Sequence, residues 1–218
     1  MVKENLKKIQ RKIKKICSKK RNPQEITLIG ISKKQPIEKI KEAYEAGLRH
    51  FGENTAQEFL EKYNKLPHDI VWHFVGHLQK NKVKLIIDKI SFLHSLDSFE
   101  LAEEIEKKAA HINRKINCFI EVNVGKEKTK FGIDEREIEN LLSQLKQLPH
   151  LNIIGLMCLP PFEVEVERIR PYFSKLKKLS QTHSLHCTSM GMSHDFEVAI
   201  EEGATHLRIG ETLFGERK

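Results

Sequence analysis

Residues 27–53, "TLIGISKKQPIEKIKEAYEAGLRHFGE", decide the fold of this chain. The apolar run Thr27–Ser32 predicts a buried strand, and a second run at His50–Glu53 predicts another. The segment Pro36–Gly47 between them predicts a helix, because proline stands in its first turn and glycine at its end. Its apolar residues recur near the helical period: Ile37, Ile40 and Ala43. The stretch is therefore a strand–helix–strand unit.

The same alternation continues along the chain. Eight apolar, β-branched runs predict buried strands: Thr27–Ser32, His50–Glu53, Trp72–Gly76, Phe92–Leu96, Asn117–Val124, Asn152–Leu159, Leu185–Ser189 and His206–Gly210. Further helices are predicted at Ser98–Ala109, Asp134–Gln147 and Ser193–Gly203. An open doubly wound sheet is the competing fold, but it usually has fewer strands and a glycine-rich first turn. We therefore predict an α/β fold, a single (β/α)8 TIM barrel preceded by one extra helix.

Composition fits one domain over residues 1–218. Hydrophobic residues make up 39% and charged residues 31% of the chain, and no linker rich in Pro, Gly or Ser interrupts it. No apolar stretch approaches the roughly 20 residues of a membrane span, and the amino terminus lacks the apolar core of a secretory signal. The four cysteines are scattered without CxxC spacing, so we expect reduced thiols, no metal site and a cytoplasmic location.

The first 22 residues are strongly basic. Residues 1–21 contain ten Lys or Arg and one Glu, and the whole chain has a net charge of +8. Apolar residues recur among them at 3-4-3 spacing: Leu6, Ile9, Ile13 and Ile16. This pattern predicts a helix over residues 1–22 with a solvated basic face. Nucleic-acid binding is the alternative, and we disfavour it because no aromatic residues are interleaved with the charges.

In a TIM barrel, chemistry is placed at the carboxyl ends of the strands. The stretch "TSMGMSHD" follows the seventh strand, and Ser193 in it is expected to begin a helix, whose free N–H groups suit a phosphate. Gly210 follows the eighth strand and lets the backbone approach an anion closely. Ser193 could instead be an ordinary helix cap. Together the two loops favour a phosphorylated ligand, since this is the usual phosphate site of the fold.

Lys33 and Lys34 follow the first strand, opposite that phosphate site. A lysine amine condenses with an aldehyde, and pyridoxal phosphate carries both an aldehyde and a phosphate. Lys33 shares strand parity with Ile29 and Ile31, and the neighbouring cation of Lys34 would favour its free amine form. The alternative is that both lysines are solvated ends of the strand. The residues alone leave the two interpretations equal.

Several motifs resemble the pyridoxal phosphate homeostasis proteins, single-domain relatives of the alanine racemase barrel. They are "IGISKKQP", "WHFVGHLQKNK", "IEVNVGKEKTKFGI" and "SMGMSHDFEVAIEEGATHLRIGETLFGER", in the family's order from about Glu25 to Arg217. The resemblance implies pyridoxal 5'-phosphate as the cofactor, a Schiff base on Lys33 and an Arg208 that faces the pyridine nitrogen. It implies further cofactor contacts from Asn54, Ser189, Met190, Gly191, Ser193, Gly210, Glu211 and Thr212, and an accessory role for Lys130.

Two positions depart from the family pattern. The family often has an aromatic residue where this chain has Thr55, and commonly a proline where this chain has His77. Neither position belongs to the expected lysine or phosphate contacts. We assign His77 no catalytic role, because a loop histidine is more often exposed.

The resemblance implies a carrier that holds pyridoxal phosphate reversibly and supplies it to apo-enzymes, without catalytic turnover. An amino acid racemase is the alternative, but racemisation needs two opposed bases. The racemase family takes its second base, a tyrosine, from a separate carboxyl-terminal domain, and this chain stops at Lys218. Its own tyrosines fall in predicted helices: Tyr44, Tyr63 and Tyr172. We expect a monomer with no specific nucleic-acid partner, no membrane partner and no metal.

Overall fold

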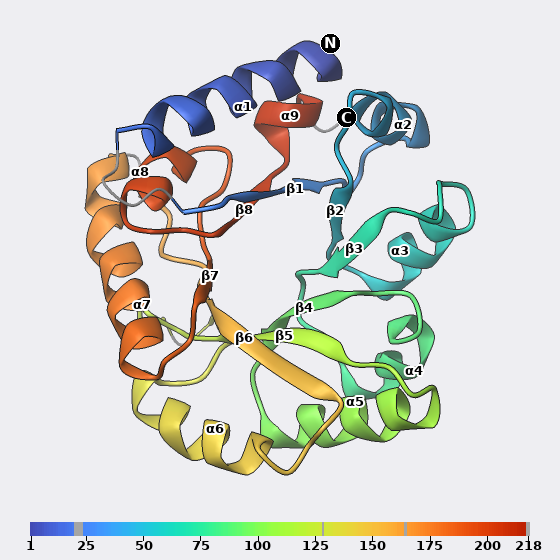
Figure 1. Ribbon diagram of the computed structural model, residues 1–218, viewed down its shortest axis with the longest axis vertical. Coiled ribbons are helices and arrows are strands. Elements are labelled where there is room, and N and C mark those ends of the chain that lie inside the picture. Colours follow the sequence, from blue (N-terminus) through green and yellow to red (C-terminus); the bar gives the residue numbers. More distant parts are fainter. Residues whose placement is uncertain (20–23, 128, 164, 217–218) are drawn as a thin grey trace.

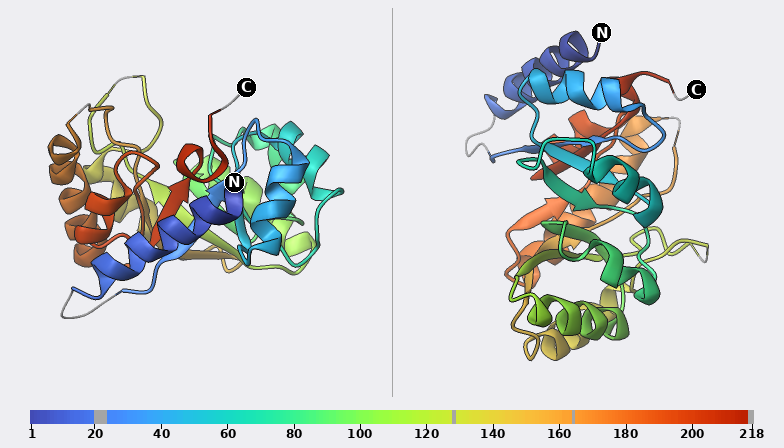
Figure 2. Two further views of the ribbon diagram at one scale, coloured as in Figure 1. Left: turned by 90° about the horizontal axis from the view of Figure 1, so that it is seen from above. Right: turned by 90° about the vertical axis from the view of Figure 1, so that its right-hand side faces the viewer.

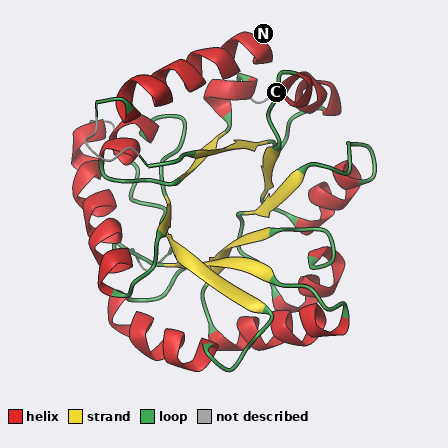
Figure 3. Cartoon of the chain, in the orientation of Figure 1, coloured by secondary structure: helices red, strands yellow, loops and turns green. Residues whose placement is uncertain are grey.

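A closed barrel of parallel strands is the framework of the molecule (Figures 1 and 3). The computed structural model describes residues 1–19, 24–127, 129–163 and 165–216. Within these ranges, eight strands pair in chain order and β8 closes the barrel against β1. The strands are β1 Thr27–Ile31, β2 His50–Glu53, β3 Val71–Phe74, β4 Phe92–Leu96, β5 Ile116–Glu121, β6 Leu151–Met157, β7 Cys187–Ser189 and β8 His206–Ile209. The predicted barrel is confirmed.

Helices surround the barrel, as the side views of Figure 2 show. The α-helices are α1 Val2–Cys17, α2 Ile37–Glu45, α3 Ala56–Tyr63, α4 Val83–Ile86, α5 Phe99–His111, α6 Ile138–Leu145, α7 Arg170–Thr182, α8 Phe196–Glu201 and α9 Glu211–Phe214. Short 3-10 helices are η1 Lys80–Lys82, η2 Glu135–Glu137 and η3 Val166–Ile169. In the described part of the chain, no helix has both the length and the apolar character needed to cross a bilayer.

The amino-terminal helix α1 packs on the outside of the barrel beside α8 and α9 (Figure 1). Val2, Leu6 and Ile9 are buried in the core, and Ile13 and Ile16 pack against it. The lysines lie on the exposed side, as the apolar stripe predicts. The helix ends at Cys17, earlier than predicted, and residues 20–22 of the prediction lie outside the described residues.

Local capping confirms two predicted helix starts and corrects a third. The Ser98 hydroxyl accepts the Leu101 N–H at 3.3 Å, and Asp134 forms a capping box with Glu137. The expected helix start at Ser193 is wrong, since α8 begins at Phe196. The turn before α8 is closed instead by Asp195, whose carboxylate accepts the Met192 N–H at 2.6 Å.

Imidazole and phenyl rings fill the interior of the barrel toward the amino ends of the strands. His73 stacks on Phe92 with ring centroids 4.3 Å apart, and His94 stacks on Phe119 at 4.4 Å. Nearer the carboxyl ends of the strands, Ile29, Ile31 and Val75 form a separate small apolar cluster. This cluster lies between the ring-filled interior and the loops that hold the expected site residues.

Candidate functional site

One cavity of about 450 Å³ opens at the carboxyl ends of the strands. Its volume suits a small-molecule cofactor. Seven residues expected at the site line it: Lys33, Asn54, Lys130, Ser193, Arg208, Gly210 and Glu211. Apolar side chains complete the wall, including Ile31, Val75 and Phe162. The structure therefore brings the end of β1 and the loops after β7 and β8 into one pocket.

Lys33 and its neighbour Lys34 take different positions. Lys33 lines the cavity and is partly buried, whereas Lys34 is exposed and adopts a left-handed backbone conformation with φ 57°. The Lys34 N–H donates to the Glu58 carboxylate. Lys33 therefore lies at the pocket, whereas the exposed Lys34 matches the alternative of a solvated strand end.

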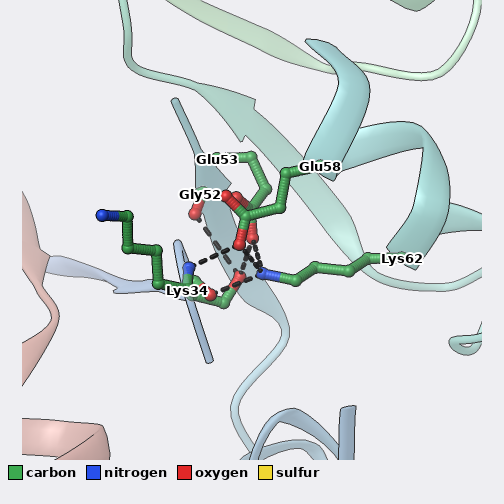
Figure 4. Close-up of polar contacts among 6 residues, drawn as sticks. Lys34, Gly52, Glu53, Glu58 and Lys62 are labelled. Carbon is green, nitrogen blue, oxygen red and sulfur yellow. Dashed lines mark hydrogen bonds and ion pairs between the residues drawn. The ribbon is translucent and has the colours of Figure 1, made fainter. Parts of the chain in front are cut away.

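A mostly buried polar cluster of Ser32, Glu53, Glu58 and Lys62 supports this turn. Figure 4 shows Glu53, Glu58 and Lys62 of this cluster. The Lys62 ammonium donates to the Ser32 carbonyl at 2.6 Å, to Glu53 at 2.7 Å and to Glu58 at 2.8 Å. The Ser32 hydroxyl donates to Glu53 at 2.5 Å. Burial raises the pKa of Glu53, and the adjacent Lys62 opposes that shift. Sequence reasoning missed this cluster, although the i,i+4 spacing of Glu58 and Lys62 marked part of it.

Arg208 provides a buried cation at the floor of the cavity. Its side chain donates through Nη1 to the Ser189 hydroxyl at 2.5 Å and through Nη2 to the Cys158 carbonyl at 2.8 Å. Asp195 and Glu121 lie near it, but neither forms an ion pair with it among the described residues. Burial lowers the pKa of Arg208, yet guanidinium stays charged in proteins. A buried cation of this kind suits a ligand that offers a lone pair or a negative charge.

The loops after β7 and β8 are joined by two hydrogen bonds. The Thr212 N–H donates to the Ser193 hydroxyl at 3.1 Å, and the Thr212 hydroxyl donates to the Ser193 carbonyl at 3.2 Å. Gly210 begins the α9 turn, and a Cβ atom there would lie 3.3 Å from the Ile31 carbonyl oxygen. The two loops and the end of β1 are thus held close together around the pocket.

Met190 and Gly191 lie behind the pocket rather than in its lining. Met190 is fully buried in the core. Gly191 has φ 93°, and a Cβ atom there would lie 2.6 Å from Cβ of Ala199, so only glycine fits this turn. Ser189 reaches the site through Arg208, and Thr212 through Ser193. Cofactor contacts by these four residues stay predictions.

Asn54 and Lys130 both line the cavity, from the segments that follow β2 and β5. The Asn54 Oδ1 atom is buried and has no hydrogen-bond partner among the described residues, so it can accept a donor from a ligand. Lys130 forms an ion pair with Glu127 and donates to the Pro160 carbonyl at 2.9 Å. It therefore ties together the loops after β5 and β6, which project from the same end of the barrel (Figure 2).

His77, to which we assign no catalytic role, is not among the lining residues of this pocket. Its Nδ1 atom lies 3.2 Å from the Asp97 carboxylate, and its ring stacks on Phe131 with centroids 3.8 Å apart. Thr55 comes directly before α3 and is exposed.

Sequence comparison identifies the family. The family model of the alanine racemase N-terminal domain matches residues 3–218. A pyridoxal phosphate homeostasis protein of Aquifex aeolicus is 46% identical over 223 residues, covering 99% of this chain and 98% of the relative. This chain belongs to the pyridoxal phosphate homeostasis family. A Pasteurella multocida member is 33% identical over 99% of this chain and 97% of its own length.

Solved structures agree with this membership. PipY of Synechococcus elongatus with PLP bound has a TM-score of 0.85 and 33% identity, covering 99% of this chain and all of that one. The alanine racemase of Corynebacterium glutamicum has a TM-score of 0.71 at 17% identity, and the match covers 61% of that chain. This second likeness shows the shared barrel fold alone. The resemblance read from the sequence motifs is confirmed.

Proposed function

We propose that this protein binds pyridoxal 5'-phosphate reversibly in the cavity at the carboxyl ends of the strands and supplies it to apo-enzymes. The observation that carries the proposal is that one cavity is lined by Lys33, by Arg208 and by Ser193 and Gly210 from the loops after β7 and β8. The Lys33 amine matches the aldehyde of pyridoxal phosphate, and the buried Arg208 cation matches its ring nitrogen. The loops after β7 and β8 match its phosphate. The PLP-bound state of the PipY relative supports the same cofactor.

Different residues of the cavity would hold different groups of the cofactor. When bound, pyridoxal phosphate supplies an aldehyde that the Lys33 amine can hold covalently. Ser193, Gly210, Glu211 and Thr212 would hold the phosphate, and Asn54 would accept a donor beside the ring. These assignments fit the Asn54 Oδ1 atom, which has no hydrogen-bond partner in the described part of the chain, and the close approach of the two loops.

Arg208 favours storage of the cofactor over catalysis. A guanidinium is a donor only, so a ring nitrogen that faces it must accept and stay unprotonated. An unprotonated ring withdraws electrons poorly and supports carbanion chemistry weakly. The Ser189 and Cys158 hydrogen bonds keep Arg208 at the pocket floor.

An amino acid racemase is the second candidate, and the placement of the tyrosines speaks against it. Racemisation needs a second base opposite the lysine. Tyr44, Tyr63 and Tyr172 lie on the outer helices α2, α3 and α7, and none lines the cavity. We therefore propose a carrier without turnover, acting as a cytoplasmic monomer without a nucleic-acid partner. The buried thiols of Cys118 and Cys158, whose pKa burial raises to about 12, fit a reducing compartment.

Borohydride reduction followed by mass spectrometry tests the proposal. The protein loaded with pyridoxal phosphate should lose its aldimine absorbance on reduction, and the modified peptide should map to Lys33. Lys33→Ala should abolish the modification, whereas Lys34→Ala, which removes the exposed neighbour, should retain it. Modification of Lys34 alone would overturn the site. Turnover of L-alanine or L-serine well above the Lys33→Ala background would overturn the carrier assignment.

A further inference from the structure

A line of polar side chains runs through the barrel interior from the amino ends of the strands to Arg208 at the floor of the cavity. It begins at His50, the first residue of β2, whose Nδ1 lies 2.9 Å from Nε2 of His73. Nδ1 of His73 lies 2.9 Å from Nε2 of His94, and Nδ1 of His94 lies 2.8 Å from the Ser189 hydroxyl oxygen. Arg208 donates to that same oxygen. We call these three rings and the hydroxyl the histidine line.

Burial makes the members of the histidine line depend on one another. His73, His94 and Ser189 are at most 1% exposed, so solvent cannot satisfy their polar atoms. His50 is partly buried, at the amino-terminal end of the barrel. Burial lowers the pKa of His73 and His94 well below the usual range, and neighbouring histidines add to the shift. Both rings are therefore neutral at pH 7, each with one donor and one acceptor nitrogen.

Arg208 fixes the direction of every hydrogen bond in the line. A guanidinium can only donate, so Ser189 accepts from it. The single Ser189 proton then points to Nδ1 of His94, because no other acceptor of that hydroxyl exists among the described residues. His94 consequently carries its proton on Nε2 and donates to His73, and His73 donates through its own Nε2 to His50.

We propose that His94, backed by His73 and His50, is a positioning residue that holds Ser189 as an acceptor for Arg208 and so orients Arg208 toward the cofactor pocket. The claim that Arg208 is oriented toward a cofactor rests on the proposed function. The ring assignment rests on the hydrogen-bond geometry and on the burial of the two rings, and it does not depend on the cofactor. The side chain of His94 does not line the cavity and acts only through Ser189.

Simple ring packing is the competing explanation, and His206 provides the control for it. His206 packs edge-on against Phe119 at 4.9 Å and lies 6.1 Å from His94, so it shares the same core. The hydrogen bond of its Nδ1 goes to the Thr205 hydroxyl at 2.9 Å, outside the histidine line. Replacement of either ring by phenylalanine perturbs packing alike, but only the change at His94 leaves Ser189 without its acceptor.

Nuclear magnetic resonance of the full chain stripped of cofactor tests the ring assignment directly. Long-range proton–nitrogen spectra at pH 7, assigned with single histidine variants, should show His94 and His73 neutral and protonated on Nε2. A proton on Nδ1 of His94, or a charged ring at either position, would overturn the proposal. The protonation state is read from the wild-type chain without cofactor, and the variants serve only to assign its signals.

Equilibrium binding of pyridoxal phosphate tests the positioning role. His94→Phe should weaken affinity about tenfold, the effect of one hydrogen bond to a charged group. His94→Asn places an amide oxygen near the former Nδ1 and should restore most of the affinity, and His206→Phe should bind as the wild type does. Equal weakening by His94→Phe and His94→Asn, or by His94→Phe and His206→Phe, would overturn the role. If the wild-type chain bound no pyridoxal phosphate, the proposed function would fail, and the ring assignment would be decided by the spectra.

Discussion

The Lys62 ammonium nitrogen lies 2.6 Å from the carbonyl oxygen of Ser32, the residue directly before Lys33. Lys62 belongs to α3 and Ser32 follows β1, so this contact joins a helix to the end of the strand that presents the pocket lysine. Lys62 is 6% exposed and its partner Glu53 is fully buried. The pair therefore anchors the Lys33 turn from inside the protein.

Loss of the Lys62 charge should destabilise the fold severely. Lys62→Met keeps the length of the side chain but leaves the Glu53 carboxylate buried without its cation, which typically costs about 3–5 kcal/mol. Urea unfolding would measure the loss. Lys65→Met, in the exposed turn directly after the same helix, is the matched control and should change stability by less than about 0.5 kcal/mol. Equal effects of the two changes would contradict an anchoring role for Lys62.

Two glycines with the same backbone conformation should differ in their tolerance of alanine. Gly191 and Gly47 both have positive φ, 93° and 101°, so both changes impose backbone strain of about 1–3 kcal/mol. At Gly191 the new Cβ would also lie 2.6 Å from Cβ of Ala199, whereas at Gly47 no atom of the residues that the structure describes would lie within 4 Å. Gly191→Ala should therefore lower the thermal midpoint clearly more than Gly47→Ala. A larger effect at Gly47 would show that the turn after β7 is not closely packed.

The sequence predicted the barrel because its signals are local. Each apolar run and each helix stop, such as Gly47, is decided within a few residues. The start of α8 could not be predicted, since Asp195 closes the turn while Ser193 is engaged by Thr212 from the next loop. The histidine line and the Lys62 cluster also depend on contacts between different strands and helices, so neither leaves a periodic pattern in the chain.

Acid should destabilise the protein through His206, whose pKa burial lowers to about 4. The unfolded chain binds a proton at this residue near pH 6.5, and the folded chain does so only near pH 4. Unfolding is therefore favoured increasingly as the pH falls between these values. From pH 7 to pH 5 this single residue should remove about 2 kcal/mol from the free energy of unfolding.

The variant His206→Gln isolates that contribution. Urea unfolding at pH 7 and pH 5 should show a loss about 2 kcal/mol smaller in the variant than in the wild type. Buried carboxyl groups act in the opposite sense, as for Glu121, whose pKa burial raises to about 7. Both proteins contain these groups, so their effect cancels in the comparison. Identical losses would mean that His206 titrates alike in the folded and unfolded chains.

Ser193 should matter for the phosphate and not for the pyridine ring. Its hydroxyl accepts the Thr212 N–H at 3.1 Å and holds the loops after β7 and β8 together. Ser193→Ala removes a hydroxyl from the wall expected to hold the phosphate and breaks the contact that holds the two loops together, so affinity for pyridoxal phosphate should fall about threefold to tenfold. Affinity for pyridoxal, which has the aldehyde and ring but no phosphate, should change little. Ser143→Ala on the outer helix α6, far along the chain from both loops, is the control and should alter neither affinity. An equal loss for both ligands would place Ser193 beside the ring or the aldehyde and would contradict the expected phosphate site.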